Sequence, residues 1–575
     1  MRTPLTPSRP ATPHHPARLA AVLAIAVAVT GLTALTSPQR AEACGGFFCS
    51  SPSLPVNQSA ERIVFSKNDD GTVTAIVQIL YNGPADRFAW FLPVPGVPTL
   101  DVSSDTFFTM LQSATNPSYT FTTRFYGECD GFNNGTNNGG DGNNFTNNGG
   151  NNGDNNGGVS VLASGALGPF DYDVIEVNAS VEDKAALAVE WLGTNNYFIA
   201  PGQEGLIGPY LDAGMNLIAF RLQKDREAGD IQPIVMTYQT DQPMIPIKLT
   251  AVAADDDMGV LVWVLGDHRT IPVNYRSLVL NEAAIDWFNP GPSYDNVVNL
   301  AADDAGGQGF VTEMAGRTEP IVTALTTINE EQLLDRARSS GNLNYVNDII
   351  ALMGTWNGMS TALESTFLNG LDVPVDAFLA CPHCILESDI FGEEGPDLDA
   401  FLDAVQEWVL GPVQRSVDIL EARPWMTRLY TTMNASDMTV DPLFDFNPDL
   451  PSISNDHLAA LNIHTCGDEW YMDLPGGQRV WGDVVGRWPF SPGDAMPANA
   501  RIEQLSTAGD GHIVTDNRET IQRALQTQMD RVGPRTSEDE GCACTTTSRR
   551  SAPASGALLL GAALVGLAAM ARRRR

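Results

Sequence analysis

Apolar and polar residues alternate in several short runs of the first half of the chain, and this period of two predicts β-strands. Arg62–Phe65 and Thr72–Leu80 flank the turn sequence Asn68-Asp-Asp-Gly71, which predicts a hairpin. The further predicted strands are Arg87–Leu92 (ended by Pro93, Pro95 and Pro98), Asn216–Leu222, Ile234–Tyr238, Ile245–Ala251 and Val260–Leu265, and the predicted helices are Val181–Gly193 and Leu206–Ala213. We therefore expect an α+β domain with a mostly antiparallel, β-rich sheet over residues 44–318.

From residue 319 the period of the apolar positions lengthens to that of a helix. Asn329 is a plausible cap for a helix that runs to Arg338, and Asn344–Met353 repeats apolar residues at helical spacing. Leu398–Val417 has one apolar face, and its opposite face carries acidic residues rather than Lys or Arg. This favours packing against a core over binding to a membrane surface. The pattern predicts a helix-rich region over residues 319–530.

Residues 131–158 are almost entirely Asn and Gly. So few apolar groups cannot offset the entropy lost on ordering, so we expect a disordered loop inserted into the first domain. A cation-binding or matrix-binding tract is the alternative, but the fragment Gly-Gly-Asp-Gly does not continue into a calcium repeat.

The first 43 residues have the pattern of a secretory signal peptide. Three arginines precede the apolar segment Leu19–Leu35, and the small-residue site Ala41-Glu-Ala43 follows it. We expect the export machinery to carry the chain and cleavage to fall between Ala43 and Cys44. Acylation of Cys44, as in a lipoprotein, is the alternative, and the acidic residue of the site disfavours it.

The C-terminal end combines a cysteine pair in a linker over 531–555 with an apolar stretch and an arginine cluster over 556–575. The apolar stretch is shorter than the roughly 20 residues of a comfortable transmembrane helix, and the arginines would keep the end in the cytoplasm. The residues of this pattern are Cys542, Cys544, Arg572, Arg573, Arg574 and Arg575.

This order of parts resembles the MYXO-CTERM tail, whose pattern is a Cys-bearing motif, a short transmembrane helix and an Arg cluster. The resemblance implies processing near Cys542 or Cys544 by an intramembrane sorting protease. It also implies display at the cell surface or outer envelope, with membrane anchoring through the tail at least before processing.

Charge narrows the possible partners. Ten of the 34 Lys and Arg and one of the 69 Asp and Glu lie in residues 1–43 and 545–575, so the segment between them carries about −44 against −35 for the whole chain. Such an acidic body repels phosphate backbones, which excludes nucleic acid as a partner. The acidic clusters at 255–257, 303–304 and 441–449 could bind divalent cations. None has the spacing of a known calcium loop, so a solvated surface is favoured.

Cysteine usage is typical of an oxidising compartment. Six cysteines remain outside the sorting motif, and they allow 15 disulfide connectivities. The disulfide candidates are Cys44, Cys49, Cys129, Cys381, Cys384 and Cys466. We expect the two local pairs, Cys44 with Cys49 and Cys381 with Cys384, and sequence alone proves neither.

The sharpest chemical candidate is Cys381-Pro-His-Cys384, which resembles the active site of periplasmic thiol oxidants with a thioredoxin fold. Residues 377–380 offer only a short candidate strand before it, and the segment after it is interrupted by glycine and proline, so a structural disulfide is favoured. A zinc site built from Cys381, Cys384, His464 and Cys466 is the third possibility.

Other catalytic signatures are absent: the chain contains no H-E-x-x-H, G-x-S-x-G or P-loop motif. His268 in Gly-Asp-His-Arg has the context of a turn residue. Glu313 could act as an acid or base, but a hydrogen-bonding structural role is favoured. We therefore assign no catalytic residue, no metal and no cofactor.

Four segments, in order, resemble the family called domain of unknown function 2330, over about residues 44–318. They are Cys44–Cys49, Phe88–Pro98, Ile271–Tyr275 and Gly309–Glu313, and weaker matches continue at Trp425–Tyr430 and Met438–Pro442. The family has no established biochemistry, so the resemblance implies an extracytoplasmic surface role and no site residue.

Together these patterns predict a non-catalytic surface protein that contributes to the envelope, or to binding or adhesion, with an unknown extracellular ligand. The alternative is an extracytoplasmic thiol-disulfide oxidoreductase that uses Cys381 and Cys384. The oxidoreductase requires a solvent-accessible, reducible pair with His383 near the reactive sulfur, whereas a structural bond is buried or inert.

Overall fold

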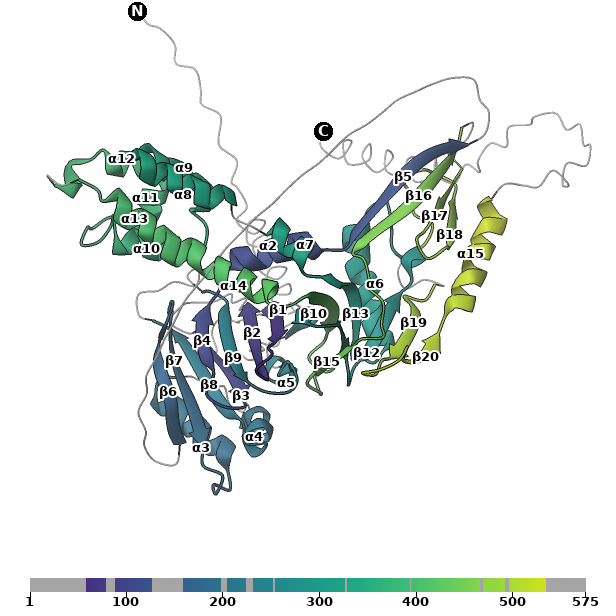
Figure 1. Cartoon of the computed structure of the whole chain (residues 1–575). Coiled ribbons are helices and arrows are strands. Elements are labelled where there is room, and N and C mark those ends of the chain that lie inside the picture. The colour runs from purple at the N-terminus through teal and green to yellow at the C-terminus, as the bar shows by residue number, and fades with distance from the viewer. Residues whose placement is uncertain are drawn as a thin grey trace, which may run out of the picture.

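The computed structural model describes residues 58–78, 88–126, 159–197, 204–223, 231–251, 254–325, 328–392, 395–465, 469–491 and 496–533. The fold is a mixed α+β arrangement of large sheets and helices (Figure 1). Outside these ranges lie the predicted Asn/Gly loop, the transmembrane helix at 556–575 and the sites Ala43, Cys44, Cys49, Cys129, Cys466, Cys542, Cys544 and Arg572–Arg575. Within these ranges, no helix combines the length and the apolar character needed to cross a bilayer.

A ten-stranded sheet runs through the centre of the molecule. In spatial order its strands are β20 (His512–Asp516), β19 (Asn499–Gln504), β12 (Arg276–Leu280), β13 (Gly309–Arg317), β14 (Trp425–Met433), β10 (Ala254–Gly266), β1 (Gln58–Lys67), β2 (Thr72–Gln78), β9 (Ile234–Gln239) and β4 (Thr99–Val102). The predicted hairpin is confirmed, since β1 and β2 pair antiparallel. β1 with β10 and β12 with β13 pair in parallel, and the other pairs of this sheet are antiparallel.

A four-stranded sheet packs on one face of the large sheet and forms a sandwich with it. Its strands, in order, are β3 (Ala89–Val94), β8 (Asn216–Leu222), β7 (Phe170–Val177) and β6 (Val159–Leu167). Alternate residues of each strand enter the shared core, and Trp90 stacks on Phe220 with ring centroids 5.6 Å apart. Helices α3 (Lys184–Thr194) and α4 (Glu204–Asp212) cover the outer face of this smaller sheet.

Helices cover the opposite face of the large sheet. They are α2 (Asp105–Thr115), α6 (Pro290–Asp304), α7 (Glu319–Ala324) and α14 (Gly411–Glu421). Phe108 of α2 contacts Trp263 of β10, with ring centroids 6.0 Å apart, so aromatic packing fixes the helix on the sheet.

A third sheet and a helix complete the end of the molecule that holds β19 and β20. The sheet consists of β18 (Arg479–Gly482), β17 (Trp470–Asp473), β16 (Asp456–His464) and β5 (Ser118–Tyr126), and the helix is α15 (Arg518–Val532). β5 and β6 therefore belong to different sheets, although they flank the Asn/Gly tract in sequence. A short two-stranded sheet, β11 (Arg269–Pro272) with β15 (Phe444–Asn447), lies beside the large one.

The helical part has an apolar core of its own. Its elements are α8 (Ile328–Ser340), α9 (Asn344–Met353), α10 (Met359–Ser365), α11 (Val375–Ala380), α12 (Pro382–Leu386), α13 (Leu398–Val405) and a π-helical turn (Gln406–Leu410) that leads into α14. The expectation of a helix-rich region over 319–530 therefore holds only to Glu421. Strands β14–β20 follow, and β14 lies between β13 and β10. The prediction failed here because the partners of β14 are distant in sequence and its local pattern does not reveal them.

Three local predictions were wrong. Asn329 does not precede its helix as a cap but lies within α8, which begins at Ile328. Ile245–Ala251 is not a strand but contains the short helix α5 (Ile247–Thr250), which closes with hydrogen bonds from Leu249 N to Pro246 O and from Ala251 N to Ile247 O. Pro93 does not end its strand but lies within β3, opposite Leu217. β3 is the edge strand of its sheet, a position in which the missing N–H of a proline is tolerated.

Candidate functional site

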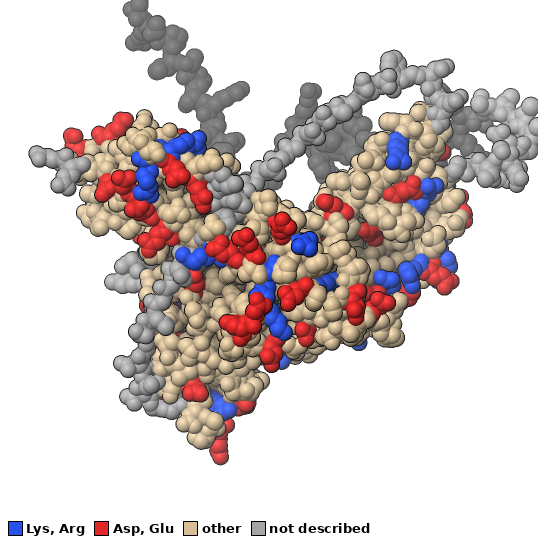
Figure 2. All heavy atoms as spheres, in the orientation of Figure 1, with Lys and Arg blue, Asp and Glu red and all other residues tan. Residues whose placement is uncertain are grey.

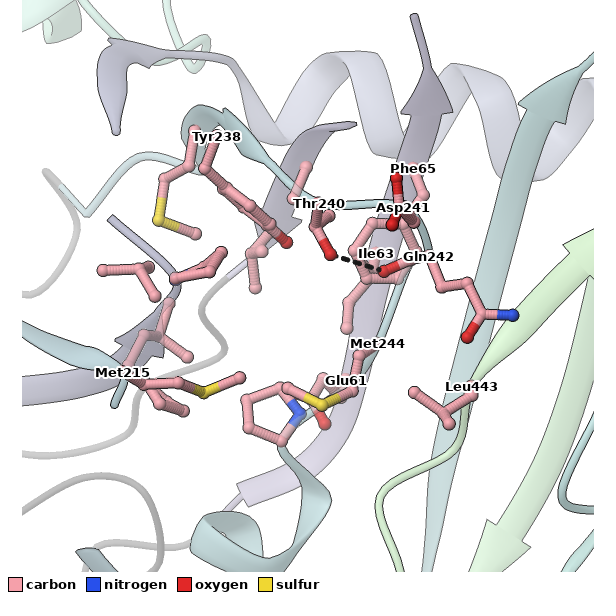
Figure 3. A pocket seen from close by; sticks show the side chains of 18 residues that line it. Glu61, Ile63, Phe65, Met215, Tyr238, Thr240, Asp241, Gln242, Met244 and Leu443 are labelled. Carbon is pink, nitrogen blue, oxygen red and sulfur yellow. Dashed lines mark hydrogen bonds between the residues drawn. The ribbon is translucent and has the colours of Figure 1, made fainter. Parts of the chain in front are cut away.

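A cavity of about 290 Å³ lies in the sandwich, between the large sheet and β3. Figure 3 shows Met215, Tyr238, Met244 and Glu61 around it, with residues 240–242 from the segment that follows β9. A cavity of about 150 Å³ is enough for a benzene-sized molecule, so this one has room for a ligand about twice that size.

The alternation of the sheet strands explains how the cavity forms. Glu61, Ile63 and Phe65 project from β1 to the same face, and Ala75 and Val77 of β2 do the same. Ala75 is small where a strand core usually carries a large side chain, which leaves space beneath the opposite sheet. The sequence therefore builds an apolar chamber whose strand wall carries one carboxyl group.

Glu61 is the unusual member of this wall. Its side chain is only 6% exposed, and its buried Oε2 has no hydrogen-bond partner in the part of the chain that the structure describes. Burial disfavours the charged form and raises the pKa of Glu61 to about 7. Near neutral pH the carboxyl group is therefore present both as a hydrogen-bond donor and as a carboxylate.

The cavity reaches the surface at the exposed residues Pro95 and Asp241. The segment at this opening is held locally: Thr240 Oγ1 donates to the carbonyl oxygen of Gln242 at 3.3 Å, and Gln242 Nε2 donates to Asp445 Oδ2 at 3.2 Å. Met215 and Met244 line the interior behind it. Methionine adapts its shape to different apolar partners, which suits a ligand chamber.

The opposite face of the large sheet carries a buried polar network. Arg428 donates through Nε to Glu313, and Tyr294 donates through its hydroxyl to the same carboxylate. The guanidinium also donates to Thr115 Oγ1 at 3.0 Å and lies over the ring of Trp263. Burial and the charge of Glu313 raise the pKa of Tyr294 well above its ordinary value. Both carboxylate oxygens of Glu313 are engaged, so the network ties α2, α6, β13 and β14 together.

Cys381 and Cys384 form a close pair whose sulfur atoms are bonded. Cys384 is exposed and Cys381 is half-buried, and the ring nitrogens of His383 lie 3.6 Å from Cys381 Sγ and 3.7 Å from Cys384 Sγ. The residues before the motif form α11, not the short strand considered at 377–380. The pair thus has the exposure of a reactive site, without the strand that precedes it in a thioredoxin fold.

The other candidates from the sequence are separated in space. His464 ends β16, far from α12 (Figure 1), so it cannot share a zinc ion with Cys381 and Cys384. His268 is exposed in the turn between β10 and β11. Among the described residues, Cys381, His383 and Cys384 form the one group whose ligand atoms converge, within 4.8 Å, and no acidic cluster does so. Figure 2 shows Asp and Glu dispersed with Lys and Arg over the visible face.

Glu61 and Arg428 were missed at the sequence level, although the pattern contained a signal. Arg428 has Met426 and Tyr430 at i±2, and Glu61 has Ile63 and Phe65 at i+2 and i+4, which places each charge on a packed face of its strand. The pattern does not identify the groups that the charged side chain contacts on that face.

A family model described as "Uncharacterized protein conserved in bacteria (DUF2330)" matches residues 38–330, just over half of the chain. No curated protein and no solved structure is significantly similar to the chain. The matched range includes β1, β2, β3, β8 and β9, which supply most of the cavity wall.

Proposed function

Because the chain belongs to DUF2330, a family of uncharacterised bacterial proteins, we propose from its own geometry that it is an exported, surface-anchored protein that binds a small, mainly apolar ligand. The binding site is the cavity of the sandwich. The observation that carries this proposal is the buried carboxyl group of Glu61, whose Oε2 has no hydrogen-bond partner among the described residues, in the apolar strand wall of a chamber that opens to solvent.

A sandwich whose only task is to be stable gains nothing from this arrangement. Filling the space beside Ala75 would add dispersion contacts, and an aliphatic residue at position 61 would remove the cost of burying a carboxyl group. A bound ligand that fills the chamber adds the dispersion contacts, and a hydrogen bond between the ligand and Glu61 offsets the cost of burying the carboxyl group. The site resembles ligand pockets in general, which are mostly apolar with few polar groups that fix orientation.

The ligand should therefore combine an apolar body with one hydrogen-bonding group, such as a hydroxyl, a carbonyl or an amine. A neutral Glu61 can donate to an oxygen, and an ionised Glu61 can accept from an amine. The carboxyl group of Glu61 and the absence of Lys and Arg from the lining of this chamber disfavour an anionic ligand there.

The test is a titration of the exported protein with N-phenyl-1-naphthylamine, an uncharged apolar dye that fluoresces when it leaves water. We expect one saturable site. Ala75→Leu should weaken the affinity at least tenfold by filling the chamber, and Met244→Phe is a second blocking variant outside the sheet. Val235→Leu is the matched control, because Val235 packs on the opposite face of β9. Equal affinity in all four proteins would exclude the cavity as the site.

Export and surface anchoring are part of the same proposal. It rests on the signal peptide pattern before Cys44 and on the tail that contains Cys542, Cys544 and the four terminal arginines. Mass spectrometry of the protein recovered from the cell surface should find Cys44 as the first residue and a new C-terminus near Cys542 or Cys544. An intact tail on surface-exposed protein would contradict processing by a sorting protease.

A second candidate function is thiol-disulfide exchange at Cys381–Cys384, because Cys384 is exposed and His383 lies against both sulfurs. A substrate dithiol would be oxidised to a disulfide while the Cys381–Cys384 bond is reduced to two thiols, so that two electrons and two protons pass to the protein.

The reduction potential distinguishes a catalytic pair from a structural one. A value near about −120 mV, with one thiol that reacts rapidly at neutral pH, would support the exchange activity. A value below about −300 mV with slow thiol trapping would identify a structural bond.

A further inference from the structure

A second, larger cavity of about 700 Å³ is lined mainly by β12, β13, β19 and the segments around them, and it shares no lining residue with the apolar chamber. Its wall mixes apolar side chains with polar ones, and the polar ones include Arg269, Arg501, Glu282 and His457. We propose that this cavity binds an organic carboxylate that also carries hydroxyl or amino groups, and that Arg269 holds the carboxylate.

Arg269 is the key observation. It is 9% exposed, and among the described residues its buried Nε has no hydrogen-bond partner and its Nη1 donates only to the backbone oxygen of Pro451, at 3.3 Å. In the part of the chain that the structure describes, Arg269 makes no ion pair. A buried guanidinium without a counter-charge is costly, so an anion in the cavity would remove a real penalty.

Three of the acids around the cavity are already engaged, and a fourth, Asp510, is exposed. Glu503 pairs with Arg501 at 2.8 Å, Glu313 with Arg428, and Glu282 with His457 Nδ1 at 2.6 Å. Burial lowers the pKa of Arg269, and the more distant charge of Glu503 offsets this in part. Arg269 therefore has no ion-pair partner of its own among the described residues, and its one positive charge matches one carboxylate better than a doubly charged phosphate.

Other atoms of the wall specify the rest of the ligand. Glu282 Oε2 and Thr312 Oγ1 are buried and lack partners among the described residues. Buried polar atoms are almost always hydrogen-bonded, and a carboxylate oxygen can only accept, so the ligand must bring a donor to Glu282. Sugar acids and peptide termini share this chemistry, since both combine a carboxylate with hydroxyl or amino donors.

The experiment titrates the exported protein by calorimetry with D-glucuronate and dialanine, and with D-glucose and dialanine amide as counterparts that lack the carboxylate, at constant ionic strength. We expect at least a tenfold preference for one acid over its counterpart without the carboxylate. The preferred acid then identifies the source as a sugar acid or a peptide terminus. No binding of either acid at 10 mM, or equal binding of an acid and its counterpart without the carboxylate, would overturn the proposal.

Two variants locate the site. Arg269→Gln should reduce the affinity for the preferred acid at least tenfold. Arg518→Gln should change it less than twofold, because Arg518 lines the same cavity but is exposed and already pairs with Asp516. If Arg269→Gln does not fold, Arg269→Lys, which keeps the charge and loses the planar fork, replaces it with the same expected direction. Unchanged affinity in the folded variant would contradict the role of Arg269.

Discussion

Glu61 and Glu313 are both buried glutamates on strands of the same ten-stranded sheet, yet their hydrogen bonding differs. Glu313 accepts from Arg428 and Tyr294, while Glu61 faces an apolar cavity and has an oxygen without a partner among the described residues. The difference teaches that burial alone does not define the role of a carboxylate. A partnered carboxylate holds elements together, and an unpartnered one beside a cavity is available to a ligand.

Removal of Glu313 should have the largest effect on stability. Glu313→Gln leaves the guanidinium of Arg428 buried without its counter-charge, so we expect a loss of about 3–5 kcal/mol in the free energy of unfolding. Urea denaturation followed by tryptophan fluorescence measures it. A loss below about 1 kcal/mol would mean that water reaches the pair, and the contrast with Glu61 would fail.

Glu61 should make stability depend on pH with the opposite sign to an ordinary salt-bridged acid. Its pKa is about 7 when folded against 4.5 in the unfolded chain, so the folded state holds the extra proton between these values. The stabilisation that comes from this proton is full below about pH 4.5. As pH rises to about 7, the free energy of unfolding falls by at most about 3 kcal/mol.

The control for this prediction is Glu61→Gln, which cannot titrate. The difference in unfolding free energy between wild type and this variant should change between pH 4.5 and 7 and stay constant above it. A difference that does not vary with pH would show that Glu61 is ionised in the folded protein.

The Cys381–Cys384 bond should contribute less to the free energy of unfolding than Glu313 or Glu61 does. A cross-link between residues so close in sequence removes little chain entropy, and the loop-closure relation gives about 2 kcal/mol. We expect the double Ser variant to lower the unfolding temperature of the helical part slightly, with dye affinity at the sandwich unchanged. A loss of dye binding would show that the two regions are coupled.

An exposed ion pair should have the smallest effect. Arg338 of α8 pairs with Asp403 of α13 at 2.8 Å, but both side chains are largely exposed, so Arg338→Gln should cost less than about 1 kcal/mol. Thermal unfolding of the variant tests whether the large effect of Glu313 on stability comes from burial and not from pairing alone.

Part of this fold could be predicted from the sequence, and the reason is local. The β1–β2 hairpin has its turn residues between two apolar runs, and α9 has its helical period, so both follow from neighbouring residues. The position of β14 between β13 and β10 could not be predicted, because it depends on pairing across more than 100 residues. The cavities could not be predicted for the same reason, because Glu61, Met244 and Leu443 line one cavity only after the sheets have assembled.

The protonation of Glu61 can be followed directly by NMR of protein labelled with ¹³C at the glutamate carboxyl group, with the signal assigned through Glu61→Gln. We expect a pKa near 7 in the free protein and a further rise when N-phenyl-1-naphthylamine fills the cavity and excludes water. A pKa near 4.5 that the dye does not move would contradict both the buried carboxyl group and its place in a ligand site.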